Sequence, residues 1–143
     1  MKKIKHLLKT KGHEIFHISP NATVYEAIEL LSEKGVGALL VMRDEKLVGL
    51  LSERDYARKV ILRGKSSREC RVEEIMSTKV LCIPPEGQIE EAMALMTERR
   101  IRHLPVVESG NVVGVISIGD VVKAIISEHE FHIEQLEKYI MTG

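Results

Sequence analysis

The chain of 143 residues repeats itself once. A shift of 65 residues aligns residues 15–62 (repeat one) with residues 80–127 (repeat two) without a gap, and about a quarter of the 48 paired positions are identical. Repeats of this length are whole supersecondary units that bury their faces against each other. A unit of about 60 residues is marginal alone. We therefore expect one body in which the two repeats pack with pseudo-two-fold symmetry.

Each repeat predicts the element order β-α-β-β-α. Apolar residues spaced i, i+3, i+4, i+7 begin at Val24 and at Ile89 and indicate amphipathic helices, the first with a capping box from Thr23 to Glu26. Short apolar runs separated by polar turns indicate the strands. The predicted strands are 14–18, 38–42 and 47–51 in repeat one and 79–83, 104–107 and 112–116 in repeat two, and the closing helices are 53–62 and 119–129. The fold class is α+β.

The remaining segments flank these units. We place the boundaries of the repeats, with their flanks, at about 11–63 and 76–130, with a polar linker over 64–75. Residues 3–10 and 131–143 read as N-terminal and C-terminal helices. The whole of 1–143 is thus predicted to be a single module.

Composition excludes several functions. Lys and Arg number 21, as do Asp and Glu, and aromatic residues make up 3% with no Trp. A neutral chain with few aromatic side chains argues against nucleic-acid binding. No apolar run reaches the roughly 18 residues of a membrane span, and the basic N-terminus lacks the apolar core of a secretory signal. With only two cysteines, Cys70 and Cys82, we expect a reducing, cytoplasmic location.

The same four-residue pattern closes the last strand of both repeats. It reads Ser52-Glu53-Arg54-Asp55 and Ser117-Ile118-Gly119-Asp120. An ionised Asp can accept both hydroxyls of a ribose cis-diol, and a Ser beside a helix N-terminus lies where free N–H groups favour an anion. The same spacing is also an ordinary helix N-cap. The pattern therefore leaves both interpretations open.

Arg102 and His103 precede Leu104-Pro105 and together suit a phosphate. Their counterparts Gly37 and Ala38 carry no charge, whereas the closing helix of repeat one carries Arg54, Arg58 and Lys59. We therefore expect the two clefts between the repeats to differ in ligand or occupancy. A solvated surface charge is the alternative interpretation for each of these side chains. Pro105 lacks a ladder donor, so it marks either the entry of a base or only a strand edge.

These motifs together resemble a known family. The carrying segments are Gly49-Leu50-Leu51-Ser52-Glu53-Arg54-Asp55, Gly114-Val115-Ile116-Ser117-Ile118-Gly119-Asp120 and Ile101-Arg102-His103-Leu104-Pro105-Val106-Val107. With the element order of each repeat, these segments resemble a tandem pair of CBS domains, the Bateman module, as in stand-alone bacterial CBS-domain proteins. The resemblance covers nearly the whole chain.

The resemblance implies a regulatory sensor that binds an adenosine-containing ligand between the repeats. AMP is the first expectation, followed by ATP, NAD(H) and S-adenosylmethionine. It also implies a flat homodimer and an unidentified regulated protein as partners. The resemblance implies eight binding residues, and we add Arg54 to them because of its positive charge. The eight are Ser52, Asp55, Val80, Arg102, His103, Pro105, Ser117 and Asp120.

Catalysis is not expected. No nucleophile and base pair, kinase signature or metal-ligand spacing occurs, so neither catalytic nor metal-binding residues are assigned. Gly64-Lys65-Ser66 suggests a P-loop, but the full motif needs a glycine where Lys59 stands. The alternative function is a dimerising scaffold without a physiological ligand.

Overall fold

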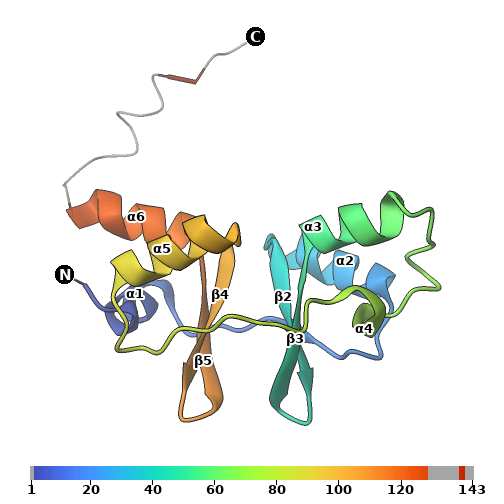
Figure 1. The fold of residues 1–143 in the computed structure, drawn as a ribbon, viewed down its shortest axis with the longest axis horizontal. Helices are drawn as coiled ribbons and strands as arrows, with labels where there is room; N and C mark the ends of the chain where they lie inside the picture. The colour runs from blue at the N-terminus through green and yellow to red at the C-terminus, as the bar shows by residue number, and fades with distance from the viewer. Residues whose placement is uncertain (1, 129–138, 141–143) are drawn as a thin grey trace.

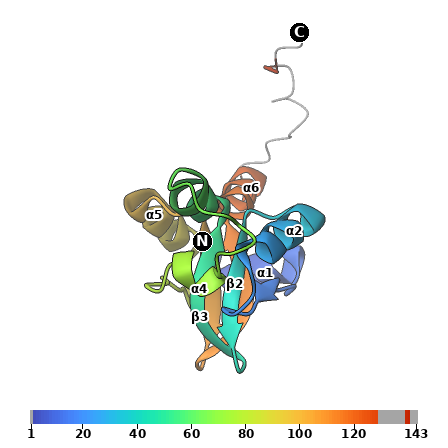
Figure 2. The same ribbon diagram turned by 90° about the vertical axis from the view of Figure 1, so that its right-hand side faces the viewer.

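Two similar halves lie side by side in the computed structural model, which describes residues 2–128 and 139–140 (Figure 1). Each half contains a β-hairpin with helices gathered at one end, and the hairpin tips project from the other end (Figure 2). This arrangement confirms the α+β architecture of two repeats. The C-terminal helix predicted over 131–143 falls almost entirely outside the described residues.

The first half comprises repeat one and the helix that follows it. Its elements are β1 (His17–Ile18), α2 (Val24–Lys34), β2 (Ala38–Arg43), β3 (Lys46–Ser52), α3 (Glu53–Tyr56), the π-helix η1 (Ala57–Ile61) and α4 (Val72–Ile75). β1 pairs in parallel with β2, and β2 pairs antiparallel with β3. The capping box predicted for α2 is present, because the Thr23 side chain accepts a bond from the Glu26 N–H.

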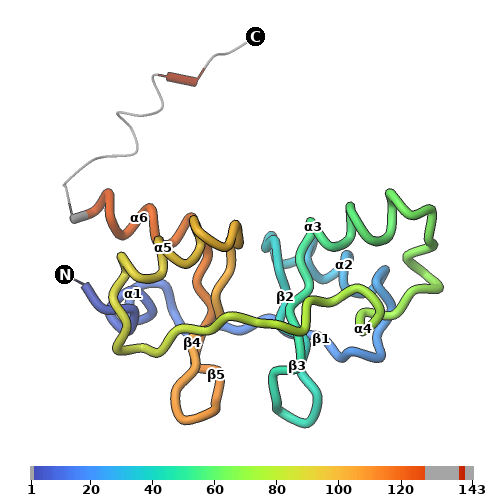
Figure 3. Tube along the Cα trace, in the orientation of Figure 1, coloured from blue at the N-terminus to red at the C-terminus, as the bar shows by residue number. Residues whose placement is uncertain are grey.

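The second half comprises repeat two and the helix that begins the chain. Its elements are α1 (Ile4–Lys11), α5 (Ile89–Arg99), β4 (His103–Glu108), β5 (Asn111–Ser117) and α6 (Ile118–Glu128). β4 and β5 form an antiparallel hairpin with a register shift between Val106 and Val107, the same place as the shift between Val41 and Met42 in the first hairpin. The two hairpins therefore match in detail (Figure 3).

The leading strands are much shorter than predicted. In place of 14–18 the structure has the two-residue β1, and in place of 79–83 it has one parallel bridge between Ile83 and Val106. Prolines follow at once, Pro20 two residues after Ile18 and Pro84 directly after Ile83. Proline has no N–H to donate, so these pairings end at Ile18 and Ile83, as predicted. The shortening is at their N-terminal ends, where residues 14–16 and 79–82 are not strand.

The short helix that precedes each repeat in sequence packs against the other repeat, so that α1 and α4 are exchanged. α1 begins the chain, yet Ile4, Leu7 and Leu8 are buried in the core of the second half. α4 lies between the repeats in sequence, yet Val72 and Ile75 are buried in the core of the first half. The predicted linker over 64–75 therefore includes a core helix. This exchange ties the two halves into one body, as Figure 1 shows.

Among the helices of the described residues, none is long and apolar enough to cross a membrane.

Candidate functional site

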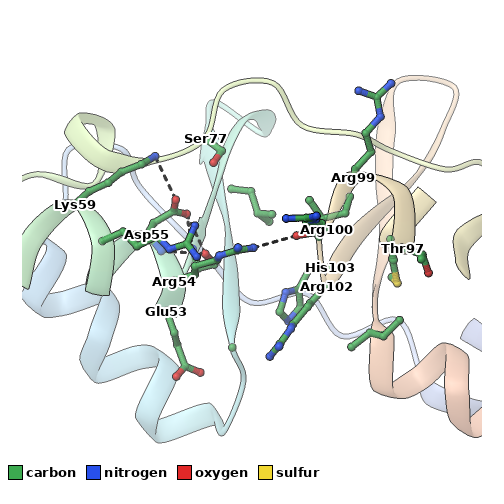
Figure 4. Close-up of a pocket in the computed structure, with 17 residues that line it drawn as sticks. Glu53, Arg54, Asp55, Lys59, Ser77, Thr97, Arg99, Arg100, Arg102 and His103 are labelled. Carbon is green, nitrogen blue, oxygen red and sulfur yellow. Dashed lines mark hydrogen bonds and ion pairs between the residues drawn. The ribbon is translucent and has the colours of Figure 1, made fainter. Parts of the chain in front are cut away.

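A cleft of about 990 Å³ lies between the two repeats, at the ends of the strands that meet the helices. Its volume is at the upper end of what small-ligand sites offer. Repeat one contributes the end of β3 and the helical segment α3–η1, and repeat two contributes the end of α5 and the start of β4. Figure 4 shows the side chains that line the cleft.

Five of the nine site residues predicted from the sequence line this cleft. They are Ser52, Arg54, Asp55, Arg102 and His103. Val80, Pro105, Ser117 and Asp120 are not part of its lining. Pro105 is buried within β4, where its carbonyl accepts the bridge from the Ile83 N–H at 3.1 Å. Val80 is half-buried in the segment before that bridge.

Ser52 and Asp55 form a reciprocal capping box at the start of α3. The Ser52 hydroxyl accepts from the Asp55 N–H at 3.2 Å, and Asp55 Oδ2 accepts from the Ser52 N–H and from its hydroxyl, both at 3.0 Å. Lys59 Nζ lies 3.2 Å from Asp55 Oδ1. The cap interpretation of this motif is therefore present in the structure, and the carboxylate also lines the cleft.

The π-helix η1 follows this cap and bears two further cations. Arg58 and Lys59 both line the cleft, and Lys59 Nζ also donates to the Ile75 carbonyl at 2.9 Å. A π-turn is rare and occurs frequently at functional sites. The matching stretch of repeat two continues as the α-helix α6.

The opposite wall of the cleft is rich in arginine. Arg99 ends α5, Arg100 is its C-cap residue, and Arg102 precedes β4. Arg54 crosses the cleft and donates from Nη1 to the Arg100 carbonyl at 3.0 Å (Figure 4). Six cations and two carboxylates line the cleft, an excess of four positive charges in a chain that is neutral overall.

His103 lies at the Gly37 end of the cleft. Atoms of the His103 ring and of the Glu53 carboxylate both come within 3.5 Å of the place where a side chain on Gly37 would begin. Burial lowers the pKa of His103, and the nearby cations Lys11 and Arg102 lower it further, against the opposite pull of Asp120. A neutral imidazole at this position can gain a proton when an anion arrives.

Ser117 and Asp120 repeat the capping box at the start of α6. Asp120 Oδ2 accepts from the Ser117 N–H at 2.8 Å, and Ser117 Oγ accepts from the Asp120 N–H at 3.2 Å. Lys11, at the end of α1, places Nζ 2.6 Å from Asp120 Oδ2. Burial acts to raise the pKa of Asp120, but the bonds from Lys11 and Ser117 outweigh it and the pKa is lowered.

The structure adds residues that the sequence patterns did not single out. Arg99 and Arg100 line the cleft without belonging to a recognised motif, and Glu53 lines it from an unassigned position inside one. One signal was available for Arg100: it is the counterpart of Gly35, and both residues cap a helix in the left-handed conformation. An arginine in repeat two at the position of a glycine in repeat one is therefore the sequence feature that distinguishes Arg100. Within the described residues, no group of three or more metal-ligating side chains occurs.

Comparison with known proteins identifies the family. The family model "CBS domain" matches residues 5–62 and 72–127. The chain is 38% identical to the "CBS domain-containing protein CBSX3, mitochondrial" of Arabidopsis thaliana, an alignment that covers 98% of this chain and 72% of that protein.

Solved structures agree with this assignment. A "putative signal-transduction protein with CBS domains" from Burkholderia ambifaria is 47% identical, with a TM-score of 0.88 over 92% of this chain and 99% of that one. A hexameric CBS-CP12 protein from bloom-forming cyanobacteria is 26% identical, with a TM-score of 0.78 over 92% of this chain and 76% of that one.

A more distant match shares the fold. The CBS domain pair of protein MJ0100, solved with 5′-methylthioadenosine and S-adenosyl-L-methionine, is 22% identical, with a TM-score of 0.79 over 90% of this chain and 98% of that one. The duplicated element order, the family match to both repeats and the likeness to solved CBS pairs agree: this chain belongs to the CBS-domain family and is a tandem CBS-domain pair.

Proposed function

We propose that this CBS pair is a regulatory module that binds an adenine nucleotide in the cleft between its repeats. The observation that supports it most is the cleft itself, in which the Ser52–Asp55 motif of one repeat faces the arginine-rich wall of the other. A carboxylate suits a ribose diol and guanidinium groups suit phosphate. The MJ0100 pair, which has the same fold, was solved with two adenosine derivatives.

In this proposal Asp55 binds the ribose hydroxyls, and Arg54, Arg102 and His103 approach the phosphates. To bind the diol, Asp55 must exchange part of its bond with Lys59 for the ligand hydroxyls, and Lys59 then becomes available to phosphate. Val80 and Pro105 do not line this cleft, so they belong to the proposal as backbone contacts to the base of a second ligand. Ser117 and Asp120 are the symmetry-related position for a second ligand, where Lys11 now pairs with the carboxylate.

The regulatory part of the proposal follows from the position of the cleft. A ligand held from both repeats favours one relative orientation of them, and a second, regulated protein can respond to that change. We further propose that the module works in the cytoplasm as a homodimer rather than as an enzyme. Ile61 and Leu62 at the end of η1 are 56% and 78% exposed, and a second chain would cover such side chains.

Thermal shift with adenosine, AMP, ADP, ATP, NAD(H) and S-adenosylmethionine tests the proposal. At a hundred times Kd a ligand adds about 2.7 kcal/mol of stability, which raises the Tm by roughly 5–10 °C. Arg102→Ala is expected to reduce the shift for AMP but not for adenosine, whereas Arg63→Ala, outside the cleft lining, leaves both unchanged. If no compound in the panel shifts the Tm and light scattering finds a dimer, the module is a dimerising scaffold.

A further inference from the structure

The conformation of Arg100 is unusual. At φ 54° and ψ 43° it has a left-handed backbone at the C-cap of α5, where its N–H bonds to the Met96 carbonyl. Gly35 has the same conformation at the C-cap of α2, with φ 64° and ψ 37°. Left-handed geometry is unfavourable for a residue with a Cβ, and glycine is its usual occupant. Repeat two therefore keeps an arginine where the backbone prefers glycine.

Core packing does not explain this arginine. Arg100 is exposed rather than buried, and it lines the cleft. Its carbonyl is held at 3.0 Å by Arg54, which reaches over from the first repeat. A guanidinium has five N–H donors, so Arg54 can keep this bond and still donate to a ligand. Strained residues that the surrounding structure holds in place cluster at ligand sites.

The charge of the cleft indicates the kind of ligand. Three cations lie on each wall: Arg54, Arg58 and Lys59 on the first repeat, and Arg99, Arg100 and Arg102 on the second. Of the two carboxylates, Asp55 is already paired with Lys59. The excess of four positive charges matches a triphosphate chain, which carries about four negative charges near neutral pH, whereas a monophosphate carries about two.

We propose that the cleft selects adenine nucleotides by the charge of their phosphate chain, favouring ATP over AMP and rejecting the cationic S-adenosylmethionine, and that Arg100 is the residue that sets this preference. The proposal rests on the adenine nucleotide site proposed above. It reverses the order expected from sequence, in which AMP came first. The left-handed strain at Arg100 is then the stability given up for a guanidinium at the phosphate chain.

Isothermal titration of adenosine, AMP, ADP and ATP, in buffer with a chelator to keep the phosphates free of magnesium, tests the preference. For the unaltered chain we expect affinity to rise along this series, with ATP at least about tenfold tighter than AMP. Raising the salt concentration should weaken ATP more than AMP, because screening acts on the larger charge. S-adenosylmethionine should bind more weakly than adenosine.

The decisive variant is Arg100→Gly, because it moves stability and affinity in opposite directions. It relieves the strain, so the Tm without ligand should rise, and it removes a phosphate contact, so ATP affinity should fall about tenfold while adenosine affinity stays the same. Arg100→Lys keeps the charge and should keep most of the ATP preference. Glu45→Gly is the matched control: Glu45 is also left-handed, at φ 65°, but lies in a hairpin turn outside the cleft lining. It should raise the Tm and leave every affinity unchanged.

The possible failures are distinguishable. If adenosine binds and ATP binds no tighter than AMP, the charge selection is wrong and the proposed adenosine site remains. If Arg100→Gly keeps the full ATP preference, Arg100 does not set it. If none of the four compounds binds the unaltered chain, this inference is overturned, and the proposed function falls with it only if NAD(H) and S-adenosylmethionine also fail to bind.

Discussion

The closing helices of the two repeats start alike and then diverge. Ser52 and Asp55 cap α3, which widens into the π-helix η1, whereas Ser117 and Asp120 cap α6, which runs on as an α-helix. The cations also differ. Asp55 is paired with Lys59 of its own helical segment, but Asp120 is paired with Lys11 from α1. The duplicated motif therefore provides the same cap twice and two different surroundings.

The same division runs through the rest of the two repeats. Core positions match: Leu39 and Leu104, and Val41 and Val106, are identical pairs that are all buried. Apart from Ser52 and Asp55, whose counterparts are identical, the residues that line the cleft differ from their counterparts in the other repeat. The pairs that differ there are Gly35/Arg100, Gly37/Arg102, Ala38/His103, Arg54/Gly119 and Lys59/Ala124. The shared positions maintain the frame, and most of the charges that make the cleft basic come from unshared ones.

The exchange of α1 and α4 gives the largest expected effect. Leu8 is 1% exposed and contacts the position of Gly114 in the second half. Leu8→Ala should lower the free energy of unfolding by about 2–4 kcal/mol, because it opens a cavity in that core. Urea unfolding measures it. Lys9→Ala, at an exposed site on the same helix, should change stability by less than about 0.5 kcal/mol. Equal effects of the two variants would show that α1 is not part of the second half.

A comparison of Asp55→Asn with Asp120→Asn separates the two capping boxes. Both variants weaken a helix cap and should lose about 0.5–1 kcal/mol of stability. The two variants should differ in their affinity for the nucleotide that binds in the cleft beside Asp55. Asp55→Asn should lose about 1.5–3 kcal/mol of binding free energy, because a charged acceptor is removed from the cleft, and Asp120→Asn should lose little. Titration with ATP and its 2′-deoxy analogue measures this. A larger loss of ATP affinity for Asp120→Asn would show that the nucleotide binds at the Ser117–Asp120 position of repeat two.

The frame of this fold was predictable because it depends on local patterns that occur twice. The periodicity from Val24 and from Ile89 predicted α2 and α5, and the apolar runs predicted both hairpins. The exchange of helices was not predictable in this way, because the apolar face of α1 does not specify which repeat buries it. The sequence patterns also predicted two clefts with different charges and did not show that Arg54 and Arg102 line the same one. Which side chains of two separate repeats converge depends on how the repeats pack.

Gly35→Arg tests why the two C-caps differ. Placing a side chain at φ 64° should cost about 1–2 kcal/mol of stability, the opposite of the gain expected for Arg100→Gly. Ser32→Arg adds the same charge at an exposed position of α2 and should stay within about 0.5 kcal/mol of the original chain. Chemical denaturation compares the two. If Gly35→Arg is as stable as Ser32→Arg, left-handed strain does not distinguish the repeats.

The smallest expected effect concerns His103, whose counterpart is Ala38. Burial first, then Lys11 and Arg102, lower the pKa of His103 below its ordinary value of 6.5. The unfolded chain therefore takes up this proton at a higher pH than the folded chain does. The stability that His103 contributes is fully present above pH 6.5 and decreases as the pH falls through 6.5 toward the lowered pKa.

His103→Gln removes the proton uptake, so its Tm should decline less than that of the original chain between pH 7.5 and pH 5. If His103→Gln leaves the decline of Tm with pH unchanged, His103 takes up a proton as readily in the folded chain as in the unfolded one. The His103 position would then not differ electrostatically from its counterpart Ala38 in the way proposed.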